Sequence, residues 1–78
     1  MTDMERLKQI YDIVVASWKM YKRHTSEPCT DEKYETIMRE GEEIWKAHEG
    51  SGIGEAPKQI IFGFIEALEQ EDKERLRQ

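Results

Sequence analysis

Apolar residues in the first third of the chain recur at alternating steps of three and four. This seam consists of Met4, Leu7, Tyr11, Val14, Trp18 and Tyr21. The spacing places all six side chains on one face of a helix, because an α-helix turns once every 3.6 residues. Thr2, followed three residues later by Glu5, has the pattern of a capping box at a helix start. We therefore predict a helix over residues 3–23.

A turn and a second helix follow. Pro28 disfavours helix at the residue before it, and Thr30, which precedes two acidic residues, has the pattern of a new N-cap. The spacing predicts a helix over 31–48 with a charged outer side. Its apolar face carries Tyr34, Ile37, Met38, Gly41, Ile44, Trp45 and His48. Gly41 lacks a side chain within this face, so we expect another helix to cross closely there.

A third helix is predicted over 57–72, after a glycine-rich segment at 50–54 that suits a helix end and Pro57, which suits a helix start. Its main apolar stripe carries Ile61, Phe64, Ile65 and Leu68. Residues 69–78 are almost all charged, so we expect that end either to fray or to stay solvated. The chain thus predicts one all-α domain over 1–78: a three-helix bundle with a proline-containing turn and a glycine-rich loop, associating as a dimer.

More apolar residues are present than one face of each helix can hold. Ile13 and Met20 point away from the seam, and Phe62 points away from the centre of the third stripe. A helix that is apolar on two sides requires two neighbours. Either the other two helices supply both, or a second copy of the chain supplies one. We predict an interaction surface at Ile13, Trp18, Met20, Tyr21 and Phe62.

Charge and cysteine content narrow the possible partners and location. The net charge of −5 disfavours nucleic acid, because phosphate binding depends on clustered basic residues. The basic segment 19–24 ends the first helix, with a phosphate-binding patch made of Lys19, Lys22, Arg23 and His24 as the alternative. Cys29 is the single cysteine, so no internal disulfide can form. With no targeting pattern and no long apolar run, we expect a cytoplasmic protein without a membrane segment.

Residues that could support catalysis or metal binding do not form a recognisable pattern. His24, Cys29 and His48 are too few and too widely spaced for a zinc site. The glycines of segment 50–54 lack the spacing and the preceding strand of a phosphate-binding loop. The carboxylates of the second helix crowd its charged side, as on any solvated face. We therefore predict no catalytic residue, no metal ion and no cofactor, and a protein that is not an enzyme.

Three segments carry a family resemblance. They are IYDIVVASWKMYKRH (10–24), DEKYETIMREGEEIWKAHE (31–49) and FGFIEALEQ (62–70). In this plan the chain resembles small uncharacterised helical proteins of bacterial mobile elements and prophages. The resemblance implies a bacterial accessory role and brings no activity or site residue. The function we expect is a non-enzymatic protein-interaction or self-associating module, whose partner is itself or another protein. The alternative is a nucleic-acid-associated regulator of a mobile element.

Overall fold

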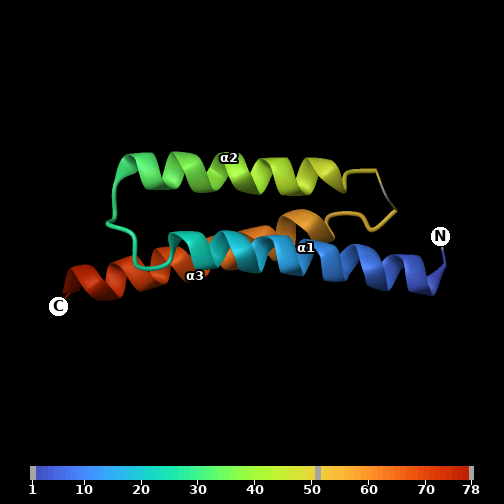
Figure 1. Cartoon of the computed structure of the whole chain (residues 1–78), viewed down its shortest axis with the longest axis horizontal. Helices are drawn as coiled ribbons and strands as arrows, with labels where there is room; N and C mark the ends of the chain where they lie inside the picture. The colour runs from blue at the N-terminus through green and yellow to red at the C-terminus, as the bar shows by residue number, and fades with distance from the viewer. Residues whose placement is uncertain (1, 51, 78) are drawn as a thin grey trace.

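The structure, a computed structural model, describes residues 2–50 and 52–77 and contains three helices. They are α1 (Asp3–His24), α2 (Asp31–Ala47) and α3 (Ala56–Arg77), and no strand occurs in the described ranges. Each helix contacts the other two, in an elongated bundle of 48 × 18 × 17 Å (Figure 1). α1 and α3 run in the same direction, and α2 runs against both (Figure 1). The all-α, three-helix prediction is confirmed.

The helix starts follow the local chemistry that the sequence indicated. The hydroxyl of Thr2 accepts a hydrogen bond from the backbone N–H of Glu5 at 3.2 Å, and the hydroxyl of Thr30 accepts one from that of Lys33 at 3.1 Å. Both threonines satisfy amides that a helix start leaves unpaired. In the loop between α2 and α3, Gly50 has a φ of 75°, in the left-handed region that glycine adopts without strain.

Among the residues that the structure describes, six apolar residues are buried and form the core. They are Ile13, Met20, Ile37, Ile61, Ile65 and Leu68. α2 and α3 approach closely at Gly41, where a Cβ atom would lie only 2.9 Å from Cγ2 of Ile61. The close crossing predicted at this glycine is therefore confirmed, and a larger side chain there would force the two helices apart.

α3 is longer than the sequence predicted. It continues as a helix to Arg77 rather than fraying beyond residue 72. Two contacts hold this charged end: the hydroxyl of Thr25 donates to Glu71 at 3.0 Å, and the side chain of Asp72 is buried against Lys33. Thr25 lies in the turn between α1 and α2, and Lys33 lies on α2. The end of α3 is therefore fixed by tertiary contacts that local sequence does not reveal.

α1 buries a different face from the one that its seam suggested. Its buried residues are Ile13, Ser17, Met20 and His24, which we call the core line. The core line lies roughly 125° around the helix from the centre of the seam, at about 100° per residue. The seam is therefore not enclosed by the bundle, because α2 and α3 lie against the core line instead.

Candidate interaction surface

Five of the six seam residues are exposed on the surface of the bundle. Their exposed fractions range from 39% for Val14 to 75% for Met4, and Leu7, Tyr11 and Trp18 lie between these values. Neighbours along the seam are three or four residues apart, so their side chains form one continuous apolar strip on α1. A strip of large apolar side chains on a small protein is typical of a contact surface for another molecule.

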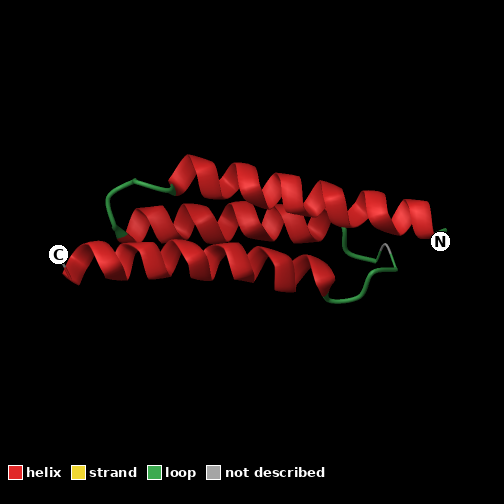
Figure 2. Ribbon diagram, turned by 90° about the horizontal axis from the view of Figure 1, so that it is seen from below, coloured by secondary structure: helices red, strands yellow, loops and turns green. Residues whose placement is uncertain are grey.

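The N-terminal end of the seam extends beyond the rest of the bundle. In Figure 2, α1 continues past the end of α2 and the start of α3. Residues 2–8 are exposed on every side, and burial begins only at Gln9, whose side-chain oxygen accepts a hydrogen bond from Nδ1 of His48 at 2.7 Å. The first two turns of α1 are therefore a projecting helix whose apolar side, with Met4 and Leu7, is left largely exposed by the other described residues.

The two long edges of the seam differ in charge. On the edge away from α3, Lys8, Lys19 and Lys22 are exposed, and the ammonium group of Lys22 lies 6.0 Å from the centre of the Trp18 ring. The opposite edge adjoins α3 through Tyr21, a partly buried residue with its ring centre 5.8 Å from that of Trp18. The seam therefore has one edge that carries lysines, of which Lys8 pairs with Asp12 at 3.7 Å, and one edge against α3.

The α3 edge of the seam is acidic at the level of Tyr21. The ring of Tyr21 also packs edge-on against Phe64, at 6.2 Å between ring centres. A hydrogen bond with Glu71, followed by partial burial, raises the pKa of the Tyr21 hydroxyl above its usual value. Glu71 thus places a carboxylate beside this edge, opposite in sign to the lysines across the seam.

The five residues predicted as an interaction surface do not lie together. Ile13 and Met20 are completely buried between the helices of one chain, so neither is available on the surface to another molecule. Trp18 and Tyr21 belong to the seam. Phe62 is 42% exposed but lies on the other side of the bundle, where its ring packs 5.5 Å from that of Trp45 on α2.

The exposed seam residues that were not predicted as a surface are Met4, Leu7, Tyr11 and Val14. One signal in the sequence distinguishes them. The seam alternates strictly between steps of three and four, which gives the narrow repeat of a coiled-coil contact rather than the wider stripe of a helix inside a globular core. A helix face that packs in a globular core usually has a third apolar position per two turns, which the seam lacks. The face that is buried, the core line, includes the polar residues Ser17 and His24.

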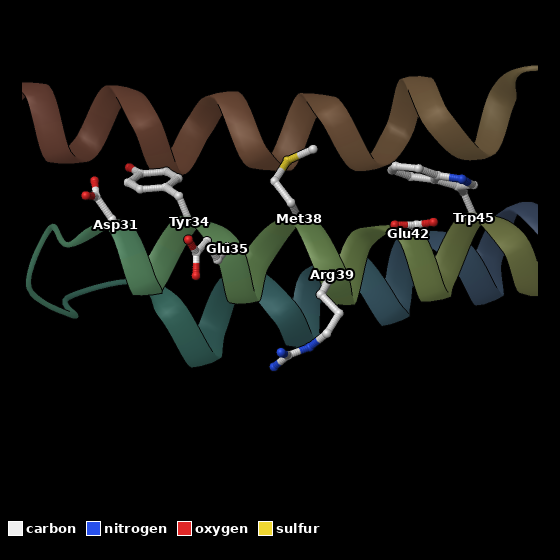
Figure 3. A pocket seen from close by; sticks show the side chains of 7 residues that line it. All are labelled: Asp31, Tyr34, Glu35, Met38, Arg39, Glu42 and Trp45. Atoms are coloured by element: carbon white, nitrogen blue, oxygen red, sulfur yellow. The ribbon is translucent and has the colours of Figure 1, made fainter.

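A second area with exposed apolar side chains is an open groove along α2, whose lining residues all belong to that helix. Figure 3 shows Tyr34, Met38 and Trp45 directed from α2 toward α3, with Arg39 directed away. This groove has a volume of about 640 Å³ and is open to solvent. Its other lining residues are Asp31, Glu35 and Glu42. The groove holds carboxylates and a guanidinium group but no nucleophile paired with a base, so it offers binding contacts rather than the parts of a catalytic site.

Two residues considered as possible metal ligands or as part of a phosphate-binding patch, Arg23 and His24, contact carboxylates of the same chain instead. Both ring nitrogens of His24 lie within hydrogen-bond distance of carboxylates, Nδ1 of Glu27 and Nε2 of Glu40 at 2.9 Å, while Cys29 is exposed in the turn. Arg23 donates to Glu40 at 2.9 Å. Within the described part of the chain, no group of three or more His, Cys, Asp and Glu side chains could hold a metal ion. Of the four patch residues, only the two lysines project freely into solvent.

The carboxylate of Glu40 on α2 is bound by Arg23 and His24 at the end of α1. Burial alone would raise the pKa of this carboxyl, but hydrogen bonds from Arg23 and His24 outweigh burial and lower the pKa below its usual value. The cluster joins the end of α1 to the middle of α2. It therefore fixes the rotation of α1, and with it the direction in which the seam faces.

A buried ion pair at the same end of the bundle joins α2 to α3. The ammonium group of Lys33 donates to both carboxylate oxygens of Asp72, at 2.9 and 3.1 Å, and to the carbonyl of Glu27. The hydroxyl of Tyr34 donates to the same carboxylate. Burial and this hydrogen bond raise the pKa of Tyr34. For Asp72, burial is outweighed by the bonds from Tyr34 and Lys33, and its pKa is lowered. Every member has a partner, so the cluster is structural.

Comparison of the chain with protein-family models, curated proteins and solved structures gave no match. Among the residues that the structure describes, no helix combines the length and apolar character needed to cross a bilayer.

Proposed function

We propose that this protein is a non-enzymatic interaction module that binds another polypeptide through the seam of α1. The observation that supports this proposal is a continuous apolar strip on a helix whose first turns extend beyond the bundle (Figure 2). Exposing such side chains to water is unfavourable by about 25 cal/mol for each Å² of apolar surface, and a partner helix would remove that cost.

Other functions draw less support from the arrangement. The nucleic-acid alternative requires a cluster of free basic groups, yet Arg23 is paired with Glu40 and His24 is buried between two carboxylates. Lys19 and Lys22 alone would neutralise few phosphates, which gives weak binding at physiological salt.

Site-specific photocross-linking in the native cell tests the proposal. A photoreactive phenylalanine analogue replaces Tyr11 in the seam, and a matched variant carries it at Arg39, an exposed residue on α2. We expect a discrete covalent adduct from position 11 and none from position 39. The mass of the adduct reports whether the partner is this chain or another protein. If position 11 yields no adduct, or if both positions yield the same products, the seam is not the contact surface.

A further inference from the structure

Resting on the proposed function, we propose that the partner of the seam is a second copy of this chain, and that the two α1 helices pair parallel and in register. The seam of each copy would cover the seam of the other along the whole of α1. This pairing makes the protein a symmetric dimer, in which the same surface is used twice.

The spacing of the seam fits a copy of itself. Met4, Tyr11 and Trp18 are seven residues apart, and Leu7, Val14 and Tyr21 form a second series of the same period, offset by three. These two series occupy the two apolar positions of a heptad, which interdigitate with the same positions of a second helix. Three complete repeats on one helix match another helix with the same repeat, which the partner copy supplies.

The size of the strip is sufficient for a dimer contact. From the exposed fractions of its side chains, the seam presents on the order of 600 Å² to solvent, about 120 Å² per exposed residue. Two seams in contact would bury roughly 1,200 Å² in total, which is the lower bound for a specific and stable interface. The stems of the flanking lysines would add apolar contact at the margin.

Charge at the edges of the seam selects the parallel orientation. In an antiparallel pair related by a twofold axis, like edges meet, so the lysine edge of one chain would lie along the lysine edge of the other. In a parallel pair, unlike edges meet, and Lys22 of one chain lies at the level where Glu71 adjoins the other seam. Asp3 also comes opposite the second chain's Lys8, in the flanking positions where coiled coils place opposite charges.

Sedimentation equilibrium tests the dimer with the purified full chain. We expect the wild type to approach the mass of two chains as its concentration rises toward about 1 mM. Tyr11→Glu should remain at the mass of one chain over the same range, because two carboxylates would be buried at the centre of the contact. The side chain of Tyr11 is 67% exposed, so the fold should survive, and circular dichroism checks that it does.

Met38→Glu is the matched control. Met38 is also an exposed apolar residue, at 41%, but it lies in the groove along α2 (Figure 3). It should dimerise like the wild type. If Met38→Glu abolishes association together with Tyr11→Glu, the seam docks into the groove of the second chain and the α1 pairing is wrong. A wild type that keeps the mass of one chain at every concentration also overturns the inference.

Cysteine cross-linking tests the orientation, in a Cys29→Ser background that removes the native thiol. In a parallel pair, Leu7→Cys alone and Trp18→Cys alone each form a disulfide-linked dimer under mild oxidation, because each residue faces its own equivalent. In an antiparallel pair, only a mixture of the two variants cross-links efficiently. We expect dimers from each variant alone. Cross-links confined to the mixture would overturn the parallel arrangement.

The results separate this inference from the proposed function. Photoadducts at position 11 whose mass includes a different protein, together with a monomeric purified chain, would leave the seam as an interaction surface and reject self-pairing. The absence of adducts in the cell, together with dimerisation at about 1 mM, would reject the functional proposal while the pairing geometry stands. If no adduct forms in the cell and the purified chain stays monomeric, both proposals are wrong.

Discussion

Of the two faces of α1, the more apolar one is exposed to solvent and the more polar one is buried. The core line is half polar, with Ser17 and His24 among its four residues, and it is completely enclosed or nearly so. The seam is wholly apolar or aromatic and is largely exposed. The core line can be buried because His24 has carboxylate partners in the adjoining turn and on α2. The comparison teaches that partners across the bundle, rather than the more apolar face, decide which side of this helix is enclosed.

Truncating one large side chain on each face should give the largest contrast. Met20→Ala should lower the free energy of unfolding by about 3 kcal/mol, because it removes buried methylene groups and leaves a cavity. Trp18→Ala should lower it by about 1 kcal/mol or less, since half of that side chain is in water. Urea unfolding of dilute protein, with the monomer predominant, measures both values. Equal losses would mean that the seam is buried in the folded chain.

A matched pair of glycine substitutions tests the packing that encloses the core line. Gly41→Ala should lower the free energy of unfolding by about 2 kcal/mol, because its Cβ would collide with the Cγ2 methyl group of Ile61 where α2 crosses α3. Gly63→Ala meets nothing within 4 Å and should raise stability by about 0.5–1 kcal/mol through helix propensity. Thermal unfolding compares the two variants. If Gly41→Ala left the free energy of unfolding unchanged, α2 and α3 would not be closely packed at this crossing.

Much of the fold follows from local signals. The caps at Thr2 and Thr30 set two helix starts, and the missing side chain of Gly41 marks a close crossing. Caps and breaks act within a few residues along the chain, so sequence alone is enough to locate them. This is why the number, type and approximate limits of the helices could be predicted.

The rotation of α1 could not be predicted in the same way. It depends on contacts between residues far apart in sequence, such as His24 with Glu40, and the position of the end of α3 depends in the same way on Lys33 with Asp72. Asp72 continues the spacing of the core residues Ile65 and Leu68, so a charge at an apolar register position was the available signal. Reading that charge as part of a frayed end was the error, because its buried partner lies 39 residues away.

Acid should weaken the attachment of the core line at its C-terminal end. The folded-state pKa of Glu40 lies below the unfolded value, near 4.5, so its contribution is present above pH 4.5 and is lost as pH falls through the folded pKa. Glu40→Gln should lower stability by about 1 kcal/mol at pH 6. The difference from the wild type should vanish toward pH 2, where the wild-type carboxyl is protonated. Urea titrations at several pH values measure it, and a difference that does not change with pH would contradict the ionic role.

The smallest expected effect tests the polar residue in the middle of the core line. The hydroxyl oxygen of Ser17 is buried and has no hydrogen-bond partner in the structure. Ser17→Ala removes a desolvated polar atom and substitutes a better helix former, so it should raise the free energy of unfolding by about 0.5 kcal/mol. Denaturant unfolding in replicate resolves a change of this size. A loss of stability would show that the hydroxyl has a partner in solution, such as a buried water. The core line would then depend on polar contacts at Ser17 as well as at His24.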